Sequence, residues 1–160
     1  MTVAEALQGV TRLGVDTSAL VDLVTGDPRS ALAWKRIQSR VDEGNLILVG
    51  STLLLVEALT TAFVLGRRTG IGAEDGELFE RPYRRLESVA VSEKISRLAA
   101  ELCIAYHLAT TDAIHLATAL ETGCEAFLTV DSDFLRVRGY PLPDAPERSL
   151  RVILTRTLRP

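Results

Sequence analysis

The feature that most constrains this chain is a regular alternation of short apolar segments with longer amphipathic ones. Between the apolar runs, apolar residues recur every three or four positions, which is typical of helices. Strands that alternate with helices favour a mostly parallel sheet with helices on both faces. We therefore predict an α/β fold, with residues 1–160 as a single domain. The expected strands cover 13–15, 46–49, 89–91, 126–130 and 151–154.

Capping residues and glycines delimit the expected helices. In the third helix we expect one buried face, made by Leu53, Val56, Thr60, Phe63 and Val64. Several glycines then break the pattern, so we expect a loop over 67–76. The helices are expected from Thr17 or Ser18 to Val24, from Pro28 to Gly44, from Thr52 to Leu65, from Ser92 to Tyr106, and from Thr110 or Thr111 to Thr122.

Composition narrows the class of protein. Hydrophobic residues make up 47% of the chain and charged residues 24%, which excludes intrinsic disorder. The net charge of -3 argues against binding of nucleic acid by bulk charge. Two cysteines without a metal or redox motif are typical of a reducing cytoplasm.

Neither a signal peptide nor a membrane span is expected. The first eleven residues carry no Lys or Arg, whereas a signal peptide starts with basic residues. The apolar run over 46–66 is interrupted by Gly50, Ser51 and Glu57. We interpret this run as a buried strand followed by a helix rather than as a membrane span.

Four acids interrupt segments that otherwise look buried: Asp16, Glu57, Asp112 and Asp131. An ionised carboxylate in an apolar interior needs a charged partner, strong hydrogen bonds or a metal. Each acid alone could be a turn, cap or surface residue, but few basic residues lie near them in the sequence. Oxygen ligands favour a hard cation, Mg²⁺ or Mn²⁺. Asp16 and Asp131 also follow predicted strands, where parallel sheets bind ligands.

The four acids lie in four distinctive segments: V-D-T-S-A-L at 15–20, S-T-L-L-L-V-E at 51–57, T-T-D-A-I-H-L-A-T-A-L at 110–120 and L-T-V-D-S-D-F at 128–134. Together these segments resemble the PIN domain family, and within it the VapC-type ribonuclease toxins of bacterial toxin–antitoxin pairs. The resemblance runs from about Leu13 to Leu154. It implies a three-layer α/β/α sandwich around a mostly parallel sheet, which agrees with the alternation described above.

The resemblance also assigns roles to residues. Asp16, Glu57, Asp112 and Asp131 match the catalytic acidic quartet of the family, and Asp133 matches an additional acid beside the fourth position. All five would be metal ligands, with Asp16 and Asp112 as the principal ones. Small hydroxyl residues beside these acids would bond a carboxylate, or else act as caps and strand-end turns; they are Thr17, Ser18 and Thr129.

The activity that the resemblance implies is hydrolysis of RNA phosphodiester bonds by a divalent-metal-dependent endoribonuclease, the toxin of a type II pair. One or two ions would activate the attacking water and neutralise charge on the transition state. The implied partners are RNA, a small cognate antitoxin protein and a second copy in a homodimer. The surface over 56–86 is the expected place for the protein partners.

Arginine makes up most of the basic residues, which gather at 67–85 and 136–159. These clusters could guide RNA by bidentate phosphate contacts, or be an ordinary solvated surface. Without the five acids of the candidate site, basic residues outnumber acidic ones. The negative net charge therefore does not exclude a polyanionic substrate.

Two other functions stay open. Asp131-Ser132-Asp133 is also a D-x-D metal motif of phosphotransfer or glycosyl-transfer sites, in which Asp16 and Glu57 would be dispensable. A PIN-like protein that binds RNA or a partner without cleavage would be expected to lack an acid, and all four are present. His115 shares a helix face with Asp112 and could bond its carboxylate, or be a satisfied histidine near the core.

Overall fold

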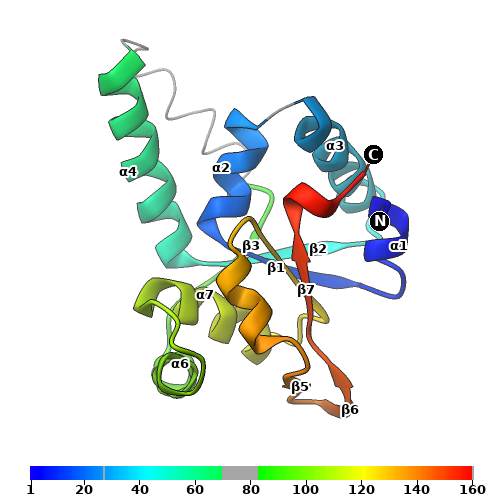
Figure 1. The fold of residues 1–160 in the computed structure, drawn as a ribbon, viewed down its shortest axis with the longest axis vertical. Coiled ribbons are helices and arrows are strands. Elements are labelled where there is room, and N and C mark those ends of the chain that lie inside the picture. The colour runs from blue at the N-terminus through cyan, green and yellow to red at the C-terminus, as the bar shows by residue number, and fades with distance from the viewer. Residues whose placement is uncertain (27, 70–82, 160) are drawn as a thin grey trace.

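A five-stranded parallel sheet forms the centre of the computed structural model, which describes residues 1–26, 28–69 and 83–159 (Figure 1). The strand order is β3-β2-β1-β4-β7, so that β1 is central. Val15 of β1 is in register with Leu128 of β4, and both strands end at the same edge of the sheet. The strands are β1 (Arg12–Val15), β2 (Ile47–Ser51), β3 (Glu87–Val89), β4 (Ala126–Thr129) and β7 (Arg151–Leu154).

Helices cover both faces of the sheet and complete the predicted three-layer α/β/α sandwich (Figure 1). One face carries α1 (Val3–Ala6), α2 (Thr17–Thr25), α3 (Pro28–Asp42) and the first turns of α4 (Thr52–Thr69). The other face carries α6 (Glu93–Tyr106), α7 (Thr110–Glu121) and the 3-10 helix η1 (Ser132–Val137). A small hairpin, β5 (Pro141–Leu142) and β6 (Ala145–Ser149), precedes β7, and η2 (Thr155–Thr157) follows it.

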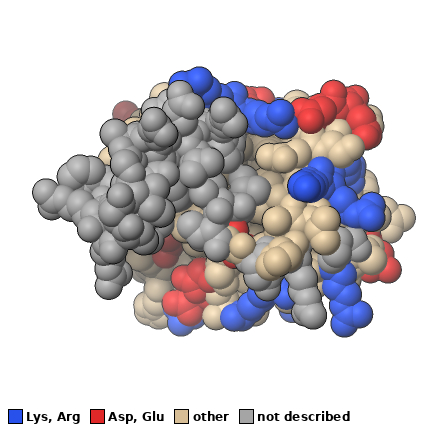
Figure 2. All heavy atoms as spheres, turned by 90° about the horizontal axis from the view of Figure 1, so that it is seen from above, with Lys and Arg blue, Asp and Glu red and all other residues tan. Residues whose placement is uncertain are grey.

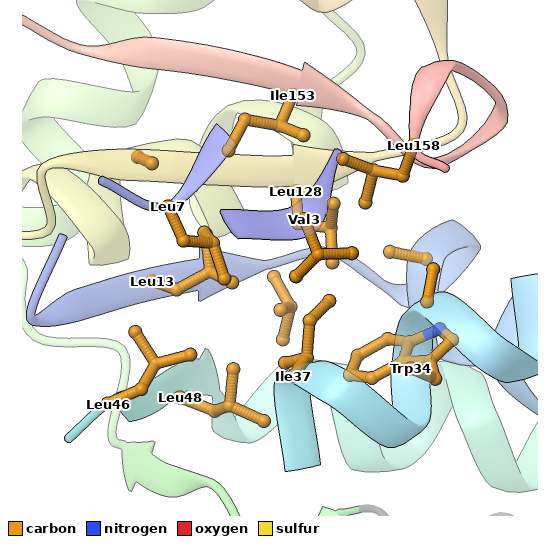
Figure 3. Close-up of a cluster of buried hydrophobic side chains, with 14 of the residues drawn as sticks. Val3, Leu7, Leu13, Trp34, Ile37, Leu46, Leu48, Leu128, Ile153 and Leu158 are labelled. Carbon is orange, nitrogen blue, oxygen red and sulfur yellow. The ribbon is translucent and has the colours of Figure 1, made fainter. Parts of the chain in front are cut away.

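The two layers of core are built by alternate residues of the same strands. In β4, Leu128 packs toward α1 and α3, whereas Phe127 packs toward α6 and α7. Figure 3 shows the first of these clusters, in which Leu13 and Leu128 from the sheet face Trp34 and Ile37 of α3. Burial on both faces explains why β1, β4 and β7 contain continuous apolar runs instead of alternating patterns, whereas the edge strand β3 is mostly exposed.

The sequence predicted most of these elements, with shifts at their ends. The N-cap of α2 is Asp16 rather than Thr17 or Ser18, because the Asp16 carboxylate accepts the backbone N–H of Ala19. Strand β3 lies two residues before its predicted position. Neither α1 nor the β5–β6 hairpin was predicted, because both are short and lack periodicity.

Helix α4 differs most from its prediction. It continues through Gly66 to Thr69, so that 67–69 are helical, and residues 70–76 of the predicted loop lie outside the described part. Among the side chains of α4 that the structure describes, Leu54 and Ala58 are buried, whereas Val56 is 60% exposed. The predicted face was wrong because apolar residues occur on every side of this helix, and periodicity then cannot identify the buried side. The side chain of Phe63 lies outside the described part.

No helix in the described ranges is both long and apolar enough to cross a membrane. The apolar run over 46–66 instead forms β2 and most of α4, as the sequence predicted.

A glycine in β1 allows α7 to approach the sheet closely. A Cβ placed on Gly14 would overlap the Cβ of Ala119 in α7 and would come within 3.0 Å of the Phe127 ring. The absence of a side chain therefore fixes the distance between α7 and the centre of the sheet. Because α7 also carries Asp112 and His115, this contact bears on the position of the site residues.

We expect Gly14→Ala to destabilise the fold by about 1–3 kcal/mol, the usual cost of overpacking a core. Ala119→Gly alone should cost about 1 kcal/mol through helix propensity. In the double variant the added methyl group has room. The double variant should therefore lose less stability than the two single variants lose together. Urea unfolding of the three variants measures this, and additive losses would contradict the proposed close contact.

Candidate metal and catalytic centre

A pocket of about 390 Å³ opens where β1 and β4 end. The chain leaves β1 toward β2 and reaches β4 only after β3, so that the pocket lies where the strand order reverses. No Lys or Arg is among the described residues that line it. They are Asp16, Thr17, Ser18, Val56, Glu57, Thr60, Thr61, Asp112, His115 and Asp131.

Asp16 is the most buried acid of the pocket, at 3% exposed. Its Oδ1 accepts the N–H of Ala19 at 2.8 Å, and its Oδ2 accepts the hydroxyl of Thr129 at 2.7 Å. The hydroxyl of Ser18 lies 2.9 Å from both oxygens. Burial raises the pKa of Asp16, and these hydrogen bonds oppose that rise. The carboxylate is thus held in one orientation at the end of β1.

Asp112 is half-buried in the first turn of α7 and has a raised pKa. Burial is the largest cause, and the negative charges of Asp16, Asp131 and Glu57 add to it. The other three acids are therefore close enough to Asp112 to repel its negative charge. A cation between them would relieve this repulsion.

Glu57 is held from two other helices. Its Oε2 accepts the hydroxyl of Thr17 in α2, and the same oxygen lies 2.7 Å from Nε2 of His115 in α7. Hydrogen bonding to His115 is the main reason that the pKa of Glu57 is lowered, and Thr17 contributes as well. Glu57 therefore remains an ionised carboxylate at neutral pH.

His115 does not bond Asp112, the partner considered from its spacing on the helix. Its ring is 2% exposed and lies between Glu57 and Ser51, with Nδ1 3.0 Å from the hydroxyl of Ser51. Ser51 is the last residue of β2, where sequence reasoning expected only a helix cap. A polar residue at the end of a third buried strand was the signal that could have identified it.

Asp131 and Asp133 have different surroundings. Asp131 lines the pocket, and its Oδ1 accepts the N–H of Asp133 at 2.8 Å at the start of η1. The Asp133 carboxylate lies 2.9 Å from the Arg136 guanidinium and is not among the described lining residues. The structure thus brings four of the five predicted acids together and places the fifth in a surface ion pair.

The residues of the pocket suit a hard divalent cation. In the described part of the chain, no three Asp, Glu, His or Cys side chains form a group that could hold a metal on their own. A site with acidic oxygen donors and few direct protein ligands suits Mg²⁺ or Mn²⁺, which keep several waters. Zinc is less suited, because the only lining imidazole, among the described residues, already bonds through both nitrogens.

The model of the PIN domain family matches residues 14–140. A structure of VapBC2 from Rickettsia felis bound to a promoter DNA fragment has a TM-score of 0.64 and 14% identity, and covers 89% of this chain and 99% of that chain. VapBC-1 from nontypeable Haemophilus influenzae has a TM-score of 0.62 and 18% identity, and covers 92% of this chain and 100% of that chain. No curated protein sequence matches the chain.

The toxin VapC20 of Mycobacterium tuberculosis, described as cleaving the sarcin-ricin loop, has a TM-score of 0.59 and 21% identity. The alignment covers 78% of this chain and 93% of that chain. At these identities, the likeness to the three structures shows the fold.

We expect Asp112→Asn to stabilise the protein when no divalent metal is added. Because the pKa of Asp112 is raised in the folded state, its ionisation disfavours folding, and this penalty grows as the pH rises through the raised pKa. The melting temperature of D112N should exceed that of wild type by a few degrees at pH 7. This difference should shrink as the pH falls toward the pKa of a free aspartic acid side chain.

Thermal unfolding in the presence of a chelator, at pH 7 and at a pH near the pKa of a free aspartic acid side chain, measures this difference. Asp42→Asn is the matched control, since Asp42 is an exposed acid that pairs with Arg85 and is not among the described residues that line the pocket. A D112N variant no more stable than wild type at pH 7 would show that burial and the neighbouring acids do not disfavour the ionised form of Asp112 as described.

Proposed function

The chain belongs to the PIN domain family, and we propose that it is a divalent-metal-dependent endoribonuclease that hydrolyses RNA phosphodiester bonds. The observation that carries this proposal is the pocket at the ends of β1 and β4. There, Asp16, Glu57, Asp112 and Asp131 gather without a Lys or Arg among the described lining residues. Such a concentration of negative charge has little structural benefit unless a cation joins it.

The proposed cofactor is Mg²⁺ or Mn²⁺, which would activate the attacking water and offset the charge that develops on the phosphate. Asp16 and Asp112 would be its principal ligands. Asp16 suits this role because three hydrogen-bond donors fix its orientation before any metal binds. Glu57 or Asp131 would accept a hydrogen bond from the attacking water, and the lowered pKa of Glu57 keeps it ionised for this task.

We also propose that the chain is the toxin of a type II toxin–antitoxin pair and acts in the cytoplasm. Structures with the same fold include VapBC complexes from several bacteria. A small antitoxin protein and a second copy of the chain are the proposed protein partners. Helix α4 offers a surface for them, because Val56, Leu59 and Val64 are exposed apolar residues.

The face drawn in Figure 2 shows no single large basic patch outside the grey area. On the face drawn in Figure 2, Lys and Arg side chains are scattered among other residues, outside the grey area. Part of the predicted basic cluster at 67–85, including Arg81, lies outside the described residues. Local arginines rather than bulk charge would therefore contact the phosphates.

The D-x-D alternative has less support. Asp133, the second acid of that motif, pairs with Arg136, and its backbone N–H occupies an oxygen of Asp131. Such a motif would also leave Asp16 without a task, although Asp16 is the most buried acid of the pocket.

We expect the purified protein to cleave RNA with Mg²⁺ or Mn²⁺ and to lose this activity in EDTA. Asp16→Asn and Asp112→Asn should each lower the rate by about 100-fold or more, the typical cost of removing one group that stabilises the transition state. Asp42→Asn should cleave like wild type, because the Asp42 side chain is exposed and is not among the described residues that line the pocket.

Structured and unstructured RNAs are incubated with each variant, and Mn²⁺ binding is measured by calorimetry in parallel. Cleavage that survives EDTA or either pocket substitution argues against a metal-dependent nuclease. Wild-type protein that neither cleaves RNA nor binds Mn²⁺ also contradicts the proposal.

A further inference from the structure

We propose that His115 is a positioning residue, which orients the Glu57 carboxylate through a hydrogen-bond chain that runs from Ser51 through the imidazole ring. The inference rests on the proposed metal-dependent activity and extends it to two residues that do not themselves carry negative charge. It is supported by the burial of the chain, by its donor and acceptor chemistry and by the position of Glu57 at the pocket edge.

The chain connects three elements of the fold. Ser51 ends β2 and is fully buried, His115 lies in the middle of α7, and Glu57 lies in the second turn of α4. The distances are 3.0 Å from the Ser51 hydroxyl to Nδ1 and 2.7 Å from Nε2 to Oε2 of Glu57. Both ring nitrogens thus have partners, and the ring is fixed at both ends.

Donor and acceptor chemistry gives the chain a direction. An ionised carboxylate can only accept hydrogen bonds, so Nε2 must carry a proton. In the neutral ring, Nδ1 is then an acceptor, and the Ser51 hydroxyl must donate to it. The buried hydroxyl of Ser51 therefore selects the tautomer whose N–H points at Glu57.

Glu57 needs such an anchor. Its side chain is 28% exposed and has three rotatable bonds, so that a single orientation is entropically costly. It also lies near Asp112, whose negative charge repels it. The imidazole N–H and the Thr17 hydroxyl reach the same oxygen from two different helices, and together they keep the carboxylate at the pocket edge.

A purely structural histidine would be a poor choice at this position. His115 begins the buried stretch 115–120 of α7, which includes the apolar residues Leu116 and Ala117, and an apolar side chain at 115 would pack there without any polar partner. The ring is useful where it can deliver a hydrogen bond to Glu57. An effect that operates through Glu57 should therefore vanish when Glu57 can no longer act as a carboxylate.

The first test reads the tautomer by NMR. His107 and His115 are the only histidines in the sequence, so His107→Asn leaves one imidazole to observe once any purification tag is removed. Long-range ¹H–¹⁵N correlations at neutral pH should show a protonated Nε2 and an unprotonated Nδ1. A neutral ring with its proton on Nδ1 would overturn the inference, whether or not the protein cleaves RNA.

The second test compares His115→Gln with His115→Leu. The glutamine amide can donate from near the position of Nε2, whereas leucine keeps the volume without a donor. We expect H115L to weaken Mn²⁺ binding by about 10–100-fold, as loss of a group that orients a ligand does. It should also lower kcat at saturating Mn²⁺ with little change in KM for RNA, and H115Q should restore both to within a few-fold of wild type.

The Glu57→Gln background separates positioning from general damage. If His115 acts through Glu57, then H115L should have little further effect on Mn²⁺ affinity or kcat in E57Q. Circular dichroism and melting temperature check that each variant is folded. Should H115L fail to fold, Ser51→Ala takes its place, because it removes the donor to Nδ1 and leaves the ring in position; a few-fold loss of Mn²⁺ affinity is then expected.

The outcomes distinguish the inference from the proposed function. Wild-type protein without Mn²⁺ binding and without cleavage would overturn both. Two results would overturn the role of His115 alone, provided that wild-type protein binds Mn²⁺ and cleaves RNA. In the first, H115L or its substitute S51A has the Mn²⁺ affinity and kcat of wild type. In the second, the substitution lowers both as much in the E57Q background as in wild type.

Discussion

Burial of a carboxylate at the end of β1 is the constraint on which the rest of the pocket depends. Asp16 is almost fully enclosed, and a charge there is costly unless dipoles and hydroxyls surround it. The N-terminus of α2 supplies a backbone N–H, and Ser18 and Thr129 supply hydroxyls from the two sides. These groups favour the ionised form of Asp16 only. Burial and the negative charges of the neighbouring acids raise the pKa of Asp112, and a cation would offset those charges.

Much of this arrangement could be predicted from the sequence, because strands that end on an acid are distinctive. The parallel sheet follows from alternating periodicity, and the meeting of Asp16 with Asp131 follows from the topology of such sheets. The buried face of α4 could not be predicted, since apolar residues surround that helix. The contact of His115 with Glu57 could not be predicted either, because spacing along one helix gives no information about a carboxylate on another helix. Asp133 pairs with Arg136, a contact that depends on side-chain direction.

Helix α7 links the core to the pocket. Its inner face rests on the sheet where Gly14 has no side chain, and its first turn carries Asp112. The same helix holds His115 between β2 and α4. A small shift of α7 on the sheet would therefore move Asp112 directly and the Glu57 carboxylate indirectly, through His115. The packing of the core thus determines the geometry of the site.

Asp16 is both a helix cap and a pocket residue, and this combination has an evolutionary consequence. Its carboxylate both begins α2 and faces the pocket, and asparagine begins helices about as well as aspartate does. An exchange of one oxygen for an amide group would leave the helix start and the protein surface intact while removing a negative charge from the centre. Descendants that keep the shape but lack this charge are thus a single nucleotide change away, and shape alone would not distinguish them from the parent.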